Sequence, residues 1–194
     1  TCWKGVFAVT RGKKGAPPKE VRPTSGKVLG ALFSILGPLQ GRSFLDLFSG
    51  TGRVAYRAAQ QGASFVAAVE ILPVRARDIR SLFPAAPSFL LLAMDIRRAL
   101  SFLERKGHRF EVIFADPPYG AGWPGILGEL LFPKSGGILV PNGVAVIEHS
   151  LREPIPSGEN YRIIDRREYG ETVLSFLASA VLPTDTSGER GEKV

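Results

Sequence analysis

The sequence predicts an α/β protein in which a mostly parallel sheet carries helices on both faces and ends in an antiparallel hairpin. Short apolar runs alternate with segments of helical periodicity, as a parallel sheet requires. The first run leads through a glycine turn into a helical pattern. After residue 150 the alternation stops, and two extended runs follow with only Tyr169-Gly170-Glu171 between them. Together these observations indicate seven strands, of which the last is antiparallel.

The elements are expected in a regular order. A helix begins after Thr24 or Ser25, either of which can act as its N-cap, and stops at Gly37-Pro38. Further helices are expected at 52–61, 73–82, 96–106 and 124–132. Parallel strands are expected at 43–48, 65–70, 88–93, 111–115 and 144–148, the last after a turn at Pro141-Asn142-Gly143. The hairpin strands are expected at 161–168 and 172–178.

The composition indicates one compact domain and excludes several classes of protein. The 194 residues suit a single domain at 24–180, preceded by a basic arm at 1–23 and followed by a polar tail at 181–194 that we expect to be disordered. A single cysteine, Cys2, excludes a disulfide framework and fits the cytoplasm. Two separated histidines offer no metal site. No apolar stretch reaches the roughly 20 residues of a membrane helix, and the compact single domain favours a monomer.

Positive charge is concentrated at the start of the chain. The net charge is +7, and residues 1–27 hold seven basic residues against one acid, Glu20, so this segment carries +6 of the total. Such an arm is an electrostatic partner for the phosphates of a nucleic acid. A basic tail that is merely solvated is the alternative interpretation.

The most informative motif is Asp116-Pro117-Pro118-Tyr119, which directly follows the apolar run 112–115. Proline has no N–H and a fixed φ, so this loop keeps its shape and turns its carbonyl groups outward. The Asp116 carboxylate and the Pro117 carbonyl can both accept hydrogen bonds, and Tyr119 offers a flat ring to a planar base. The motif therefore suits the exocyclic amine of a nucleobase. By itself it also fits a simple turn that Asp116 caps.

A second motif lies between the first expected strand and its helix. Gly50, Gly52 and Ala55 have the G-x-G-x-x-G/A spacing of nucleotide-binding loops. Eighteen residues after Gly52 the second apolar run ends in Glu70, an acid that can bind both hydroxyl groups of a ribose. Enzymes that use NAD and enzymes that use S-adenosylmethionine share this arrangement, so these residues do not choose between the two cofactors.

Charge at the strand ends favours S-adenosylmethionine. Asp95 follows the third apolar run, where it can accept from an adenine amino group or cap the helix that begins at Ile96. Ligands of open α/β sheets bind beyond the carboxyl ends of the strands. Four carboxylates are expected there, and they would repel a phosphate-bearing cofactor but suit a cationic sulfonium. These are Asp46, Glu70, Asp95 and Asp116.

These motifs resemble those of a known group of enzymes. The loop 46–52, Glu70 and the loop 116–119 look like those of class I S-adenosylmethionine-dependent methyltransferases that modify exocyclic amines, which have a Rossmann-like seven-stranded sheet. Arg22-Pro23-Thr24 and Tyr169-Gly170-Glu171-Thr172 narrow the resemblance to bacterial 16S ribosomal RNA guanine-N2 methyltransferases of the RsmD type. One departure is Leu29-Gly30, where that family usually carries a charged Arg-Glu pair, so no role of this pair is carried over.

The resemblance implies a reaction, partners and site residues. It implies transfer of a methyl group from S-adenosylmethionine to the N2 amine of a guanine in 16S ribosomal RNA, free or in the assembling small ribosomal subunit. The implied catalytic residues are Asp116, Pro117 and Tyr119. The implied cofactor-binding residues are Asp46, Phe48, Gly50, Gly52, Glu70, Ile71, Asp95, Ile96 and Asp116. The implied RNA-binding residues are Arg11, Lys13, Lys14, Arg22 and Thr24.

Two other functions stay open at this point. The loop 116–119 serves adenine amines equally well, so a DNA or RNA adenine-N6 methyltransferase is the nearest alternative, although 194 residues leave no room for a separate target-recognition domain. The other is a catalytically silent RNA-binding protein with the same fold. The presence of Glu70 and Asp116 argues against it, and a cofactor titration would distinguish the two.

Overall fold

The structure is a computed structural model that describes residues 25–84, 86–134 and 136–180. The expected basic arm at 1–23 and the tail at 181–194 lie outside these residues. Within the described ranges the helices are α1 (Gly26–Leu36), α2 (Arg53–Gln60), α3 (Pro73–Leu82), α4 (Ile96–Arg105) and α5 (Trp123–Leu131). The strands are β1 (Ser43–Leu47), β2 (Phe65–Val69), β3 (Phe89–Leu92), β4 (Phe110–Ala115), β5 (Leu139–Ser150), β6 (Tyr161–Tyr169) and β7 (Thr172–Ser179).

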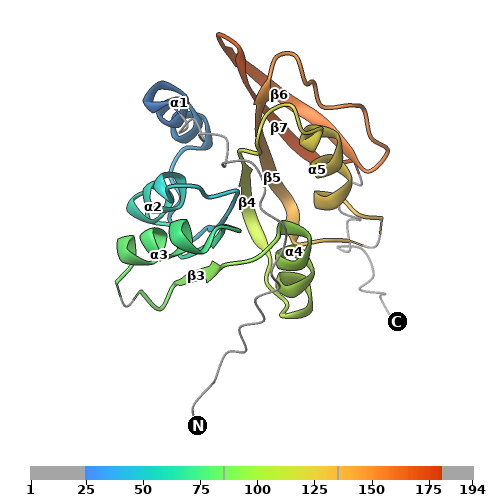
Figure 1. Ribbon diagram of the computed structural model, residues 1–194. Helices are drawn as coiled ribbons and strands as arrows, with labels where there is room; N and C mark the ends of the chain where they lie inside the picture. The colour runs from blue at the N-terminus through green and yellow to red at the C-terminus, as the bar shows by residue number, and fades with distance from the viewer. Residues whose placement is uncertain (1–24, 85, 135, 181–194) are drawn as a thin grey trace, which may run out of the picture.

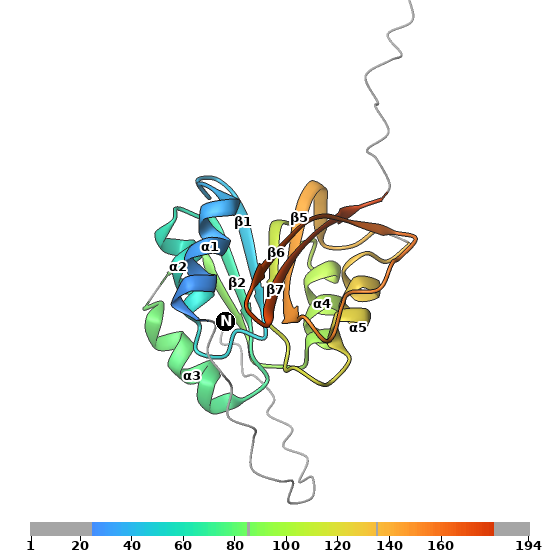
Figure 2. The same cartoon turned by 90° about the horizontal axis from the view of Figure 1, so that it is seen from above.

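The strands form one sheet between two layers of helices (Figures 1 and 2). Its order is β3-β2-β1-β4-β5-β7-β6. The strands β1 to β5 pair in parallel, whereas β7 is antiparallel to both of its neighbours. Figure 2 shows α1, α2 and α3 on one face of the sheet and α4 and α5 on the other. The predicted mostly parallel sheet with an antiparallel hairpin is therefore confirmed.

Each face of the sheet has its own hydrophobic core, because side chains alternate along a strand. On β1, Leu45 and Leu47 belong to the core covered by α4 and α5. Phe44 belongs to the core covered by α1, α2 and α3. The first helix is capped as expected, since the Ser25 hydroxyl accepts from the Val28 amide at 3.2 Å. None of the helices in the described part of the chain is long and apolar enough to span a membrane.

The expected turn at Pro141-Asn142-Gly143 is wrong as a strand boundary, because β5 begins earlier, at Leu139, and runs through it. The turn chemistry appears instead as an irregularity inside the strand. Pairing with β4 jumps from Phe110–Leu139 to Val112–Val144, so the β5 side has additional residues. Asn142 there has a φ of 65°. A bulge accommodates the proline, which has no amide hydrogen for the ladder.

The topology creates a switch point at the centre of the sheet. From β1 the chain continues to β2 and β3 on one side, and it then returns to place β4 and β5 on the other side. The loops that follow β1 and β4 therefore leave neighbouring strands at the same edge of the sheet. Open α/β sheets bind their ligands at such an edge.

Candidate active site

The loop after β1 has a backbone that few residues can adopt. Phe48, Gly50 and Gly52 have φ values of 61°, 54° and 75°. A positive φ is strained for a residue with a Cβ atom and easy for glycine. At Gly52 space is limiting too, because a Cβ atom would lie 2.9 Å from Cγ1 of Ile79 on α3. Glycine at this position thus allows α2 to start directly after the turn and to pack closely on α3.

Glu70 ties this loop to the end of β2. Its side chain is only 4% exposed. One carboxylate oxygen, Oε2, accepts from the Gly50 amide at 2.9 Å, and the other, Oε1, accepts from the Leu72 amide at 2.8 Å. A carboxylate oxygen can accept more than one hydrogen bond. These two hydrogen bonds orient the Glu70 carboxylate, and each of its oxygens can still accept a further hydrogen bond, as from a ribose hydroxyl group.

Asp46 lies beneath the loop and is 1% exposed. Its Oδ2 accepts from the Ala55 amide at 3.1 Å, which holds the first turn of α2. Burial, together with the charges of Asp116 and Glu70, raises the pKa of Asp46 to about 8, and the Ala55 hydrogen bond opposes this change. Three of the four predicted carboxylates, those of Asp46, Glu70 and Asp116, therefore lie close enough for their charges to interact. Direct contact of Asp46 with a cofactor stays a prediction.

The residues expected around the adenine have different surroundings. Asp95 is the N-cap of α4, and its Oδ1 accepts from the Arg97 amide at 2.9 Å. The capping role is therefore present, and a role in adenine binding stays a prediction. Ile96 is buried in the core under α4. Ile71 is 60% exposed directly after Glu70, so an apolar surface is available beside the acid that is predicted to bind the ribose.

The loop after β4 is joined to the end of β1. The Asp116 amide donates to the Leu47 carbonyl at 3.5 Å, so the two loops leave the sheet side by side. Pro117 is buried, whereas the Tyr119 side chain is 43% exposed. This arrangement keeps the start of the loop rigid and leaves an aromatic ring at the surface, where a base can reach it.

Glu153, which sequence reasoning missed, holds the far end of this loop. Its two carboxylate oxygens accept from the Gly120 amide at 2.5 Å and from the Gly122 amide at 3.2 Å. Glu153 lies in the connection between β5 and β6. No motif marks it, because its function depends on where that connection passes in the folded chain.

Glu148, also missed, lies at the end of β5 and is 4% exposed. Burial, together with the charge of Asp116, raises the pKa of Glu148 to about 8, and a hydrogen bond with the Tyr119 side chain opposes this change. The rule that picked out Glu70 and Asp116, an acid at the carboxyl end of a parallel strand, would have identified this residue as well.

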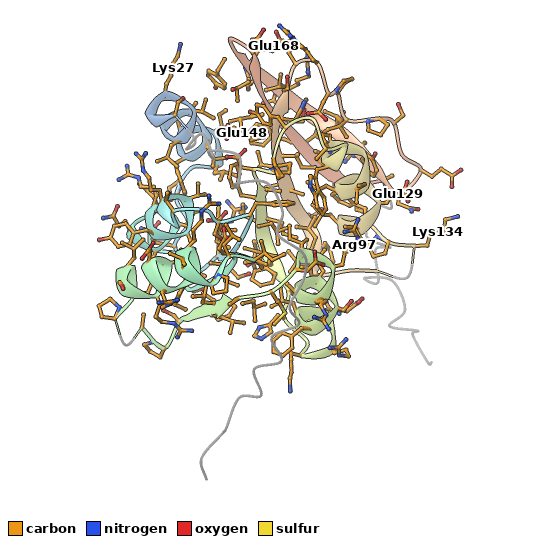
Figure 3. All side chains as sticks on the ribbon, in the orientation of Figure 1. Lys27, Arg97, Glu129, Lys134, Glu148 and Glu168 are labelled. Atoms are coloured by element: carbon orange, nitrogen blue, oxygen red, sulfur yellow. The ribbon has the colours of Figure 1, made fainter. Side chains whose placement is uncertain are left out.

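An aromatic cluster connects three elements at the same edge of the sheet. Phe48 packs edge-on against Trp123 at the start of α5, with ring centroids 4.9 Å apart. The guanidinium carbon of Arg97, labelled on α4 in Figure 3, lies 5.1 Å from the Trp123 ring centroid. Packing against Trp123 supports the strained backbone of Phe48, a predicted cofactor residue.

His149, adjacent to Glu148, has protein partners on both ring nitrogens. Nδ1 lies 2.9 Å from the Ser150 carbonyl, and Nε2 lies 2.9 Å from the Ser175 hydroxyl. Burial lowers the pKa of His149. This histidine therefore serves to join β5 to β7 rather than to titrate at the site edge.

The predicted RNA-binding residues Arg11, Lys13, Lys14, Arg22 and Thr24 lie outside the described residues. In the part of the chain that the structure describes, no group of three or more His, Cys, Asp or Glu side chains is arranged to hold a metal ion.

Comparison with known proteins relates this geometry to other chains. A Bacillus subtilis (strain 168) protein, YlbH, named as a candidate rRNA methyltransferase, is 28% identical over 184 residues, which cover 87% of this chain and 96% of that protein. Ribosomal RNA small subunit methyltransferase D of Escherichia coli (strain K12) is 26% identical over 152 residues, which cover 76% of this chain and 74% of that enzyme. A shorter match, over 46% of this chain, is to a tRNA1(Val) (adenine(37)-N6)-methyltransferase of Edwardsiella ictaluri, of which it covers 36%.

A solved structure and a family profile extend these findings. The structure of a hypothetical protein from Thermus thermophilus is 30% identical, with a TM-score of 0.68, and the match covers 86% of this chain and 93% of that one. The profile of the family described as "Conserved hypothetical protein 95" matches residues 8–178. Because this match spans all but the last residue of the sheet and both loops of the site, the chain belongs to the Conserved hypothetical protein 95 family.

Proposed function

We propose that this protein is an S-adenosylmethionine-dependent methyltransferase that modifies the exocyclic N2 amine of a guanine in 16S ribosomal RNA. The observation that carries the proposal is the pairing of the two loops at the switch point. The acceptor loop 116–119 leaves β4 directly beside the glycine loop of β1, joined by the hydrogen bond from the Asp116 amide to the Leu47 carbonyl. The names of the relatives from Bacillus subtilis and Escherichia coli support RNA of the ribosome as the substrate.

The charges of the site fit the proposed cofactor. Asp46 is a buried carboxyl whose pKa is raised to about 8, and its neighbours are other carboxyl groups. A cation favours the ionised form of such a group, whereas a phosphate-bearing cofactor is repelled by it. S-adenosylmethionine, when bound, supplies a positively charged sulfonium and its transferable methyl group. The Gly50 amide fixes one carboxylate oxygen of Glu70, the acid that we propose holds the ribose.

The acceptor loop acts on the amine of the base. That nitrogen is a weak nucleophile because its lone pair is delocalised into the ring. Hydrogen bonds from the amine to the Asp116 carboxylate and the Pro117 carbonyl localise this lone pair and direct it at the methyl group. Asp116 then receives the proton that methylation makes acidic. Further acceleration comes from holding both reactants in line, and the exposed Tyr119 ring replaces stacking that the base loses when it leaves its neighbours.

Identification of the methylated nucleoside tests this proposal. The purified protein is incubated with labelled S-adenosylmethionine and either free 16S RNA or small ribosomal subunits from a strain that lacks this gene. We expect label in N2-methylguanosine, and the better of the two substrates identifies the assembly stage. Label in N6-methyladenosine would replace the proposal by the adenine alternative, which the shorter tRNA methyltransferase match favours. Cofactor binding without transfer to either RNA would indicate a silent RNA-binding protein.

The substitution Asp116→Ala separates chemistry from cofactor binding. We expect turnover to fall by at least about a hundredfold, because general base and acceptor functions are both lost. The affinity for S-adenosylmethionine should fall far less than turnover, since the glycine loop and Glu70 remain intact. Asp78→Ala, which changes an exposed acid on α3, is the matched control. Full activity of Asp116→Ala would contradict the role given to this carboxylate.

A further inference from the structure

Glu148 lies beside the proposed catalytic aspartate. β4 and β5 pair in parallel register through Ala115 and Ile147, so Asp116, the first residue after β4, lies next to Glu148 on β5. Two residues before Asp116 is Phe114, and two residues before Glu148 is Val146. Both side chains pack in the core under α1 and α2. Because side chains alternate along a strand, both carboxyl groups face this same side. Figure 3 labels Glu148 near the end of the sheet that carries the site.

One oxygen of this carboxyl group has no hydrogen-bond partner in the part of the chain that the structure describes. Glu148 is 4% exposed, and its Oε2 is buried without a hydrogen bond among the described residues. The group does interact with the side chain of Tyr119. Buried polar atoms are nearly always hydrogen-bonded in folded proteins, so each exception requires an explanation. At the edge of a ligand site, the simplest explanation is that an atom of the ligand supplies the missing partner.

The chemistry of the bases indicates which atom this is. The inference rests on the proposed function, in which Asp116 and the Pro117 carbonyl hold the exocyclic amine. In guanine the carbon that bears this amine lies between two ring nitrogens, N1, which carries a hydrogen, and N3, which carries a lone pair. Only the N1 side offers a donor to a carboxylate beside the amine. In adenine the ring nitrogen next to the amine carries a lone pair instead. A carboxylate beside Asp116 therefore attracts the guanine edge and repels the adenine edge.

We propose that Glu148 is a specificity-determining residue whose free oxygen accepts a hydrogen bond from N1–H of the target guanine while Asp116 holds the neighbouring amine. Glu148 is thereby the element of the site that selects guanine over bases with a lone pair at this position. The Tyr119 side chain orients the carboxyl group from its other oxygen.

The charge state of Glu148 makes this selection dependent on pH. Burial and the charge of Asp116 raise the pKa of Glu148 to about 8. The hydrogen bond with the Tyr119 side chain acts in the opposite direction and lowers this pKa. The side chain opposite on β7 is Leu174, and the residues that α1 buries on this face are Val28, Leu32 and Phe33, none of which titrates. The ionised carboxylate accepts from guanine N1–H. The protonated form instead donates to a base that has a lone pair at N1.

The base 2-aminopurine is the probe that isolates this contact. It carries the same exocyclic amine as guanine, but its N1 has a lone pair and no hydrogen. Substrate RNAs are made with guanine or 2-aminopurine at the position identified by the nucleoside analysis. The ratio of kcat/KM for the two RNAs is measured for the wild type, for Glu148→Gln and for the control Glu104→Gln. Glu104 is an exposed acid at the end of α4.

We expect the wild type to prefer guanine by at least about tenfold, which corresponds to one lost hydrogen bond to a charged group. This preference should increase as the pH rises from about one unit below the pKa of Glu148 to about one unit above it. In Glu148→Gln the preference should approach one and lose its pH dependence, because an amide can donate or accept. Glu104→Gln should behave as the wild type. A ratio is unaffected by the fraction of folded enzyme.

Three results would overturn the inference. Retention of the wild-type preference in Glu148→Gln would show that another group reads N1. An equal loss of activity on both RNAs would assign Glu148 to proton transfer or to folding instead. These failures are distinct from failure of the proposed function, in which the wild type would methylate neither RNA at the target position. A wild-type enzyme that methylates guanine and 2-aminopurine equally well would contradict the role of Glu148 and leave the proposed function intact.

Discussion

Asp46 and Glu148 show how single buried acids acquire unusual properties at this edge of the sheet. Each lies within or at the end of a central strand, and each interacts with the charge of Asp116. Burial penalises the ionised form of both groups. The pKa values of both carboxyl groups are therefore raised, and a cationic ligand beside them favours their ionised forms.

This property predicts how the stability of the cofactor-free protein depends on pH. The pKa of Asp46 is about 8 in the folded protein, whereas its ordinary value, which applies to the unfolded chain, is 3.8. The folded state therefore binds more protons between these values, so stability decreases as the pH rises from about 4 towards 8, by at most about 1.4 kcal/mol per pH unit. In Asp46→Asn the stability should decrease less steeply with pH. Part of the decrease should remain, because the pKa of Glu148 is also raised in the folded protein.

Urea unfolding at a series of pH values measures this dependence. Asp78→Asn, at an exposed position on α3, provides the control and should follow the wild type. An Asp46→Asn protein whose stability falls with pH as steeply as that of the wild type would contradict the raised pKa of Asp46.

At the scale of elements, the packing of α2 against α3 depends on Gly52. A Cβ atom there would lie 2.9 Å from Ile79, in addition to the cost of its φ of 75°. Gly107 has nearly the same φ, 74°, but a Cβ atom would meet nothing within 4 Å. We expect Gly52→Ala to destabilise the protein by about 1–3 kcal/mol more than Gly107→Ala, because only the first creates overpacking. Denaturant unfolding of the two variants gives this difference, and equal losses would refute the packing argument.

The connection between β5 and β6 holds the loop after β4 through Glu153. Loss of the hydrogen bonds to the Gly120 and Gly122 amides should loosen the loop that carries Tyr119. We expect Glu153→Ala to reduce kcat/KM for RNA by roughly three- to tenfold, as the group is partly exposed. Affinity for S-adenosylmethionine should be unchanged.

Glu159→Ala tests whether this effect is specific to the loop. Glu159 lies in the same connection and forms only an exposed ion pair with Lys134, at 3.7 Å, among the described residues. Such pairs contribute little, so this variant should keep wild-type activity. Comparable losses in both variants would assign the effect to the connection as a whole.

At the scale of the whole molecule, the concentration of positive charge in residues 1–27 predicts that RNA binding and chemistry depend on different parts of the chain. Residues 1–27 hold seven basic residues and one acid. Deletion of residues 1–21 removes Lys4, Arg11, Lys13, Lys14 and Lys19. We expect weaker RNA binding and a smaller dependence of the affinity on salt, because fewer phosphates are neutralised. Binding measured at several salt concentrations gives the slope, and an unchanged slope would exclude the arm as the phosphate contact.

Much of the fold can be predicted from the pattern of apolar residues, glycines and prolines within short segments of the chain. Apolar periodicity identified β1, β2 and the final hairpin, and Pro73 and Leu82 bound α3 as expected. These patterns work because strand and helix formation depend on local periodicity and on the restricted backbones of glycine and proline. The same local signal was misleading at Pro141-Asn142-Gly143, where the chain forms a bulge rather than a turn.

Local patterns also identify the loops 46–52 and 116–119 and the acid Glu70, since each motif is contiguous or follows a strand at a regular distance. The assembled sheet sets the remainder of the site. Pairing of β4 with β5 places Glu148 beside Asp116, and the return of the chain after β5 brings Glu153 to an amide 33 positions away. Burial and neighbouring charge then alter the acidity of the carboxyl groups, and both are properties of packing between strands that lie far apart in the chain.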